Sequence, residues 1–194
     1  MTFSRIYQRN AWNGTETRSG PGSGSAATAR LRRQLLELVA ELGVASVTDA
    51  ACGEGFWQPE LPGYIGLDVA PEALATAQER HPERDYRLRD LVRQGLPGPA
   101  DLVLCRDAMQ HMSLRDGRAV LRAIRDSGST WLLASTYVGQ ANRNVATGGF
   151  YCPNLEAEPF ALAPAERLYH DGYDYSEGVT LRDPVKMLGL WRLR

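Results

Sequence analysis

Lysine is nearly absent from this sequence, in which Lys186 is the single lysine among 194 residues. The formal charge is also small, −1 at pH 7, and basic and acidic residues are interspersed along the chain. A protein that binds nucleic acid or an anionic membrane usually gathers its basic residues in one patch. We therefore expect a partner that is neither nucleic acid nor a membrane.

Long apolar runs and paired cysteines are missing as well. The longest apolar stretches, residues 131–134 and 188–191, are far shorter than the roughly 20 residues that span a bilayer. The polar N-terminus has no secretory h-region, so the expected location is cytoplasmic. Cys52, Cys105 and Cys152 show no metal-ligand spacing, and their odd number fits reduced thiols, so we expect no metal site.

The chain is long enough, and at 43% hydrophobic residues apolar enough, to bury one sizeable core. Residues 1–28 are rich in glycine, serine and threonine and lack an apolar period, which predicts a leader with at most one short helix. A helical period follows over 28–42, with Thr28 as the expected N-cap and Gly43 as the stop. We expect one domain over 29–194 behind this leader.

Strands and helices alternate in the next part of the chain. The pattern predicts helices after Pro71 and after the N-cap Ser113, and strands over 46–50, 63–67, 86–89, 101–105 and 130–136. Such alternation implies right-handed crossovers, and therefore an α/β fold with a doubly wound parallel sheet. Regular signals thin out after Tyr137, and we expect this long polar and aromatic connection to form a wall of the substrate site.

The turn after the first predicted strand carries the strongest functional signal. Its sequence is Val47-Thr-Asp-Ala-Ala-Cys-Gly-Glu-Gly55, and a second acid, Asp68, closes the next apolar run. A small-residue turn lets the backbone approach a ligand, and the second acid accepts ribose hydroxyls, so the pair predicts a nucleoside site. Phe56 stands where a dinucleotide turn needs a small residue, and the lysine of a P-loop is absent.

This segment resembles motif I of the class I S-adenosylmethionine-dependent methyltransferases, here Asp49-Ala-Ala51-Cys-Gly53-Glu-Gly55. Ala51 replaces the first glycine of the motif, and because alanine avoids left-handed backbone we predict a negative φ there. The resemblance covers most of the chain and is to the small bacterial single-domain type. It implies a Rossmann-like, mostly parallel sheet whose last strand is antiparallel, with residues 167–170 and 187–193 as the antiparallel pair that ends the sheet. It also implies S-adenosylmethionine as the cofactor.

The resemblance also implies roles for particular residues. Asp49 would contact the methionyl ammonium, Asp68 the ribose hydroxyls and Asp90 the adenine amino group. Arg106 follows the fourth strand and would lie near the methionyl part. The predicted cofactor residues are Arg18, Ser19, Gly20, Asp49, Ala51, Gly53, Gly55, Trp57, Asp68, Val69, Asp90, Leu91 and Arg106.

The leader from Trp12 to Ser23 resembles that of a group of small bacterial methyltransferases that also share Cys105-Arg-Asp107. Successive glycine and serine amides can form an anion-holding concavity, to which Arg18 adds a fork for a carboxylate. We predict that the leader closes over the methionyl end of the cofactor.

A hydroxyl acceptor must lose its proton during methyl transfer, whereas a neutral amine can attack as it stands. His111 and Asp107 are the first candidates for the base and His170 is the next, although a packing role for His111 stays open. Residues near the expected mouth, which either contact the substrate or simply pack, are Tyr7, Trp12, Asn142, Arg143, Phe150, Tyr151 and Tyr173.

The leading interpretation is methylation of a small-molecule acceptor, sugar-like or another natural-product intermediate of biosynthesis, at oxygen or nitrogen. The alternative within enzymes is methylation of a peptide or protein side chain. A non-catalytic S-adenosylmethionine-binding protein and a nicotinamide-dependent reductase share the same sheet, and both stay open.

Overall fold

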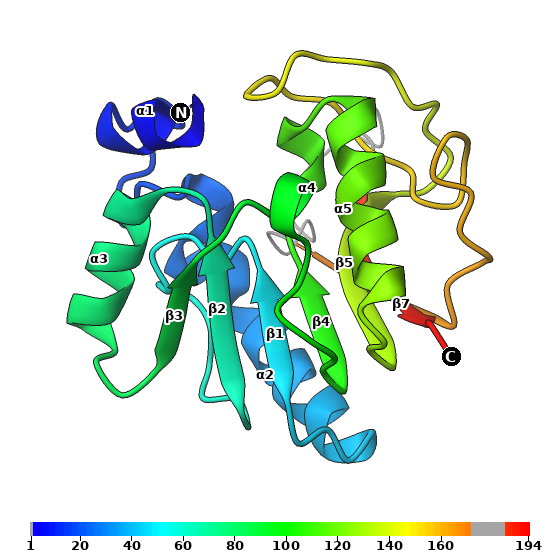
Figure 1. The fold of residues 1–194 in the computed structure, drawn as a ribbon, viewed down its shortest axis with the longest axis horizontal. Helices are drawn as coiled ribbons and strands as arrows, with labels where there is room; N and C mark the ends of the chain where they lie inside the picture. The colour runs from blue at the N-terminus through cyan, green and yellow to red at the C-terminus, as the bar shows by residue number, and fades with distance from the viewer. Residues whose placement is uncertain (1, 172–184) are drawn as a thin grey trace.

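A seven-stranded sheet with the strand order β3-β2-β1-β4-β5-β7-β6 forms the centre of the computed structural model (Figure 1). The structure describes residues 2–171 and 185–194. Neighbours from β3 to β5 pair in parallel, and β7 pairs antiparallel with both β5 and β6. This order confirms the predicted α/β architecture and the antiparallel end of the sheet. The strands are β1 (Val47–Ala50), β2 (Tyr64–Asp68), β3 (Asp85–Leu88), β4 (Leu102–Cys105), β5 (Trp131–Tyr137), β6 (Arg167–His170) and β7 (Lys186–Arg192).

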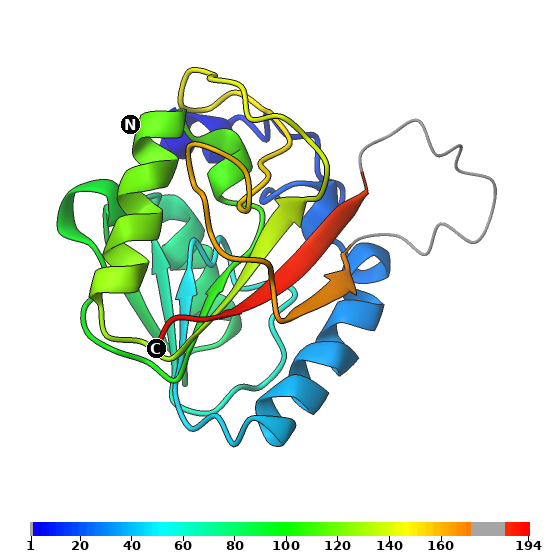
Figure 2. The ribbon, with the colours of Figure 1, turned by 90° about the vertical axis from the view of Figure 1, so that its right-hand side faces the viewer.

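Helices cover both faces of the sheet, and Figure 2 shows α2 and α5 on opposite sides of it. The first helix, α1, lies above the carboxyl ends of the parallel strands (Figure 1). The helices are α1 (Thr2–Gln8), α2 (Ser25–Glu41), α3 (Pro71–Arg80), α4 (Leu91–Gln94) and α5 (Leu114–Asp126), with 3₁₀ turns η1 (Pro21–Ser23) and η2 (Met109–His111). None of the helices in the described ranges is both long and apolar enough to cross a bilayer.

Each face of the sheet buries its own apolar layer. On the α2 face, Leu31, Leu35 and Leu38 are at most 3% exposed and belong to one cluster with residues of β1, β4 and β5. On the α5 face, Val120 and Ile124 are fully buried in a second cluster. Burying one such side chain contributes roughly 1.5–3 kcal/mol, so these layers hold both helices on the sheet.

Helix α2 begins at Ser25, earlier than the predicted start, and Thr28 is not its N-cap. The Thr28 hydroxyl instead donates to the Gly24 carbonyl within the first turn, at 2.9 Å. The Ser25 amide donates to the carboxylate of Glu16, at 2.8 Å, so the leader itself satisfies this helix end. The domain boundary predicted at residue 28 therefore falls inside a helix. Gly43 adopts φ 63°, which confirms it as the stop.

Ala51 adopts φ 79°, so the prediction of a negative φ is wrong. The amides of Ala51 and Cys52 both donate to the Leu67 carbonyl, each at 2.9 Å. Left-handed backbone costs an alanine about 1–2 kcal/mol, and these two hydrogen bonds to the neighbouring strand hold the turn in that conformation.

The leader is fastened to the domain by α1. The Tyr7 hydroxyl donates to Glu54 Oε2 at 2.5 Å and lies 3.0 Å from the Thr76 hydroxyl oxygen, and Glu54 itself is buried. Burial, aided by the Glu54 carboxylate, raises the pKa of Tyr7 to about 12, so the phenol stays protonated and keeps donating. The short helix predicted in the leader is therefore a docked element.

The N-cap of α5 gives a test of how this helix is held. Ser113 Oγ accepts from the Asp116 amide at 3.1 Å, as predicted. Ser113→Ala should lower the free energy of unfolding by about 1 kcal/mol, because one amide loses its acceptor. Ser113→Thr keeps the acceptor and should stay close to the wild type. Urea unfolding of the wild type and the two variants measures these free energies. An equal loss of unfolding free energy in both variants would contradict a capping role for Ser113.

Candidate functional site

A cavity of about 410 Å³ opens at the carboxyl ends of β1, β2 and β4, where parallel α/β sheets bind their ligands. Ala51 and Gly53 line it after β1, Asp68 at the end of β2, and Arg106 after β4. The predicted residues that line this cavity are Tyr7, Trp12, Ser19, Ala51, Gly53, Trp57, Asp68, Val69, Asp90, Leu91, Arg106, Asp107 and His111.

Other predicted site residues do not line the cavity. Gly55 packs against a ring instead, since a Cβ there would lie 2.5 Å from Tyr86 Oη. His170 is exposed at the end of β6. Tyr173 lies outside the described residues. The remaining members of this set are Arg18, Gly20, Asp49, Asn142, Arg143, Phe150 and Tyr151.

Asp68, the predicted ribose ligand, lines the cavity at the end of β2. Its Oδ2 accepts from the Gly53 amide and its Oδ1 from the Ala70 amide, both at 2.9 Å. Burial raises the pKa of Asp68, and the hydrogen bonds from Ala70, Gly53 and Val69 oppose that rise. The carboxylate is thus held rigidly between two backbone amides at the cavity wall, an arrangement that suits vicinal hydroxyl donors.

Asp90 lies at the same end, where it caps the short helix α4. Its Oδ1 accepts from the amides of Val92 and Arg93, at 3.1 and 3.3 Å. The adenine contact predicted for Asp90 therefore shares this carboxylate with a helix terminus.

Asp49 does not line the cavity. It lies one residue from the end of β1, and its side chain shares the α2 face of the sheet, where its Oδ2 accepts from Gln58 Nε2 at 2.7 Å and from the Tyr64 hydroxyl at 3.0 Å. Burial raises the pKa of Asp49 to about 6, against the lowering effect of those two hydrogen bonds. The motif acid is therefore a buried structural group in this chain.

The leader forms part of the cavity wall. Ser19 Oγ accepts from the Glu54 amide at 3.3 Å, and a Cβ at Gly53 would lie 2.5 Å from that oxygen, so the glycine admits the leader. The amides of Ser19 and Gly20 donate to Thr17, so these two amides are not available for the predicted anion-holding concavity. Arg18 lies over the Tyr7 ring at 6.0 Å.

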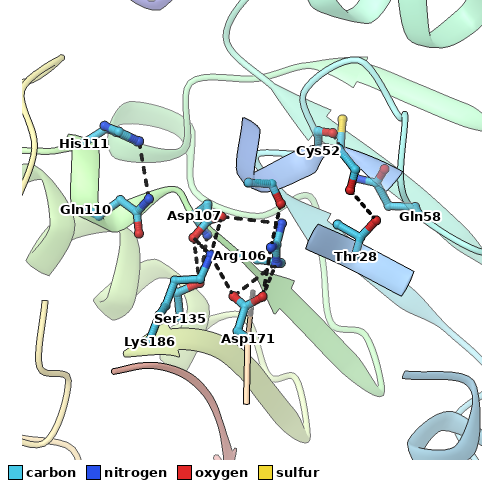
Figure 3. Close-up of polar contacts among 12 residues, drawn as sticks. Thr28, Cys52, Gln58, Arg106, Asp107, Gln110, His111, Ser135, Asp171 and Lys186 are labelled. Atoms are coloured by element: carbon cyan, nitrogen blue, oxygen red, sulfur yellow. Dashed lines mark hydrogen bonds and ion pairs between the residues drawn. The ribbon is translucent and has the colours of Figure 1, made fainter. Parts of the chain in front are cut away.

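Four charged side chains meet beside the cavity, Arg106, Asp107, Asp171 and Lys186, and we call them the ion quartet (Figure 3). Arg106 Nε donates to both oxygens of Asp171, at 2.9 and 3.1 Å. Lys186 Nζ lies 2.9 Å from Asp107 and 3.2 Å from Asp171. Their formal charges cancel, which keeps this buried group of ions in balance.

The ion quartet also holds the leader. Arg106 Nη2 donates to the Gly22 carbonyl at 2.8 Å, and the guanidinium lies 5.0 Å from the centre of the Trp57 ring. Leader, motif loop and the ends of β4 and β6 are therefore tied together through one arginine.

Asp107 is the member of the quartet that faces the cavity most. It adopts φ 55°, and its Oδ1 accepts from the Ser135 hydroxyl at 3.2 Å. Burial alone would raise the pKa of Asp107, but the charges of Arg106 and Lys186 outweigh burial and hold it well below its ordinary value. A carboxylate held ionised in this way is a weak proton acceptor.

His111 lies further along the same wall. Its Nδ1 is 2.8 Å from the Gly149 carbonyl, which can only accept, so Nδ1 carries the proton and Nε2 is the basic nitrogen. The ring packs against Trp12 and Phe150, with centroids at 4.7 and 5.7 Å. Burial lowers the pKa of His111, so the imidazole is neutral at pH 7, although the Gly149 carbonyl and Asp107 oppose that shift.

The residues predicted after β5 mainly shape their own connection. Asn142 Nδ2 donates to the Asn154 carbonyl at 2.8 Å, and its Oδ1 accepts from the Asn154 amide at 2.9 Å. Arg143 donates to the Phe150 carbonyl at 3.2 Å, and Tyr151 is fully buried in the core. These contacts depend on how the connection after β5 folds back on itself. The residue types alone do not predict that path.

Sequence reasoning missed Asp171 and Lys186. Arg106 and Asp171 are 65 residues apart, so no local pattern links them. The one available signal was that the only lysine of the chain begins an apolar strand, since a lysine at such a place needs a buried partner.

The residues that line the cavity suit S-adenosylmethionine. Asp68 offers a fixed carboxylate for the ribose, and the small residues Ala51 and Gly53 leave backbone exposed beside it. At the other end, Asp107 supplies a negative charge for a ligand that carries positive groups. Within the described ranges, no group of three or more His, Cys, Asp or Glu side chains is placed to hold a metal ion.

The environment of Asp49 predicts a pH dependence. Because the pKa of Asp49 in the folded protein is about 6, above its ordinary 3.8, the folded protein binds this proton more tightly than the unfolded chain. Its contribution is therefore favourable below pH 4 and is lost as pH rises through 6. Relative to Asp49→Asn, the wild type should lose on the order of 2–3 kcal/mol of unfolding free energy between pH 4 and pH 7.

Asp101→Asn is the matched control, because the pKa of Asp101 is lowered by hydrogen bonds, first from the Ala45 amide. That variant should be less stable than the wild type at pH 7, with the difference shrinking in acid. Urea unfolding at several pH values measures both variants. A pH-independent difference between wild type and Asp49→Asn would contradict the buried environment described here.

Comparison with known proteins agrees with this geometry. A family model described as a methyltransferase domain matches residues 47–127, from β1 to the end of α5. No curated protein matches the sequence.

Two solved structures share the fold of the whole chain. The N-methyltransferase NodS from Bradyrhizobium japonicum WM9, in complex with S-adenosylhomocysteine, is 14% identical with a TM-score of 0.69 and covers 99% of this chain and 98% of its own. The magnesium protoporphyrin IX methyltransferase from Synechocystis PCC 6803, with the same ligand bound, is 15% identical with a TM-score of 0.63 and covers 97% and 94%. Residues 47–127 thus match a methyltransferase domain, and the whole chain has the fold of these two methyltransferases, which were solved with S-adenosylhomocysteine bound.

Proposed function

We propose that this protein is an S-adenosylmethionine-dependent methyltransferase that acts on a small-molecule acceptor, sugar-like or another natural-product intermediate, at an oxygen or nitrogen atom. We propose further that His111 takes the acceptor's proton. The observation that carries the proposal is the neutral, oriented imidazole of His111 in the wall of the cofactor cavity. One of the similar structures is a magnesium protoporphyrin IX methyltransferase, and its named acceptor supports a small molecule here.

S-adenosylmethionine supplies a methyl group on a positively charged sulfur, so the protein's own residues have to align the acceptor and manage its proton. His111 Nδ1 is committed to the Gly149 carbonyl, so Nε2 is the nitrogen that can take a proton. An acceptor hydroxyl there would replace the long contact from Gln110 Nε2, at 3.4 Å. For a hydroxyl acceptor, the proton passes from oxygen to Nε2 as the new carbon–oxygen bond forms. A neutral amine attacks first and loses its proton afterwards, so it depends less on this base.

Asp107 and His170 are weaker candidates for the same role. The Asp107 oxygens both accept from Lys186 Nζ, at 3.0 and 2.9 Å, and its carboxylate stays ionised. His170 is exposed on the edge strand β6 and does not line the cavity. Of the three candidates for the base, His111, Asp107 and His170, His111 alone both lines the cavity and can take up a proton near neutral pH.

Trp12 and Phe3 support an acceptor with an apolar or ring-shaped surface. Both line the cavity next to His111, and their ring centroids lie 6.5 Å apart. Aromatic faces of this kind pack against rings and against the apolar faces of sugars. The leader, residues 1–28, thus contributes to the acceptor site as well as to the cofactor site.

The experiment is a screen of small hydroxyl and amine acceptors, with the release of S-adenosylhomocysteine as the readout. With the best hydroxyl acceptor, His111→Ala should lower kcat by about 10²–10⁴-fold, the range for removal of a general base. His170→Ala is the matched control and should retain wild-type activity. Unchanged kcat in His111→Ala would remove His111 from the mechanism, and turnover of peptides but of no small acceptor would refute the proposed acceptor class.

The pH profile gives a second check. Because burial lowers the pKa of His111, the base is available at pH 7, and kcat should fall only in acid, below the ordinary histidine value of 6.5. A rate that still rises above pH 8 would point to another base.

A further inference from the structure

The placement of Asp49 leaves the methionyl ammonium of the cofactor without the partner that the motif predicts. Asp49 Oδ2 accepts from Gln58 and Tyr64, and the residue does not line the cavity. An ammonium group in a partly buried site needs an anionic or carbonyl partner, because an unpaired charge is costly to desolvate. An anionic partner would have to be another carboxylate in the cavity wall.

Four carboxylates line the cavity, and three of them have other surroundings. Asp68 stands at the ribose end between two amides, Asp90 caps α4, and Asp116 accepts from the Thr147 hydroxyl at 2.6 Å. The fourth, Asp107, follows β4, on the opposite side of β1 from β2. Two strand spacings separate β2 from β4, about 10 Å, so Asp107 lies beyond the ribose in the direction of the methionyl part.

The ion quartet prepares Asp107 for a positive ligand. The Asp107 side chain is 18% exposed, whereas those of Arg106 and Asp171 are 2% and 0% exposed. The Asp107 carboxylate is therefore the part of the ion quartet that a ligand in the cavity can reach. Lys186 holds both of its oxygens, and the Ser135 hydroxyl holds Oδ1. These contacts fix its orientation before a ligand arrives.

Gly22 keeps the approach to this carboxylate open. A Cβ at Gly22 would lie 3.1 Å from Asp107 Oδ2 and 3.9 Å from Lys186 Nζ, so any side chain would stand directly against that oxygen. The Gly22 carbonyl is fixed by Arg106, which holds the leader at this distance.

We propose that Asp107, rather than the motif acid Asp49, is the carboxylate that binds the methionyl ammonium of S-adenosylmethionine, with Lys186 and Arg106 as its positioning residues. The inference concerns the donor site and does not depend on which acceptor is methylated. Arg106 and Lys186 each contact both Asp107 and Asp171, so neither cation neutralises Asp107 alone.

Calorimetry with two ligands tests this assignment. S-adenosylhomocysteine carries the amino-acid part, and 5′-methylthioadenosine lacks it, so the second ligand reports on the nucleoside end alone. Asp107→Asn should weaken S-adenosylhomocysteine about 10- to 100-fold, the range for one hydrogen bond between charged groups, and change 5′-methylthioadenosine less than about twofold. Asp49→Asn is the matched control and should leave both affinities near those of the wild type.

Gly22→Ala provides a test that leaves the ion quartet intact. Its methyl group stands against Asp107 Oδ2, so it should weaken S-adenosylhomocysteine selectively, whereas Gly98→Ala, where a Cβ meets nothing within 4 Å, should not. This pair decides the question if Asp107→Asn fails to fold or loses both ligands.

The proposal is overturned if neither Asp107→Asn nor Gly22→Ala discriminates between the two ligands, or if Asp49→Asn does. Failure of the wild type to bind S-adenosylhomocysteine would instead refute the assignment of S-adenosylmethionine as the cofactor. Normal binding without turnover of any acceptor would defeat only the proposed function, so the three results are distinguishable.

Discussion

The ion pair between Arg106 and Asp171 is the interaction on which the rest of the site depends. Both side chains are almost fully buried, and the guanidinium binds the carboxylate through Nε while its Nη2 reaches the Gly22 carbonyl. A buried pair of this kind contributes little net stability, because desolvation offsets the attraction, but losing one partner strands a charge. Its value here is geometric, since it fixes where β4, the chain after β6 and the leader meet.

The cavity walls follow from this constraint. With Arg106 fixed, Lys186 can bridge Asp171 and Asp107, and Asp107 is turned into the cavity in a left-handed conformation. With Gly22 fixed, Ser19 comes to rest over Gly53 at the end of β1. The leader is therefore part of the cavity wall, even though it precedes the sheet in the sequence and lacks a regular apolar pattern.

The two ends of the cavity are built on different principles. At the end near β2, Asp68 is held by backbone amides that belong to the sheet and its turns. At the end near β4, charged side chains from distant segments hold one another. The first arrangement depends on the backbone of the sheet, whereas the second depends on side chains that only the tertiary structure brings together. The motif acid Asp49 takes part in neither and is buried against Gln58 and Tyr64.

Much of the fold was determined by the sequence alone. The alternation of apolar runs, the N-cap Ser113 and the stop Gly43 are local signals, and Asp68 at the end of β2 follows from the order of the strands. The conformation of Ala51, the start of α2 and the orientation of Asp49 were decided only by the tertiary structure. Each of these features depends on a partner that is distant in the chain. The ion quartet depends on such partners more than any other feature, because charges become buried and paired only when separate segments meet.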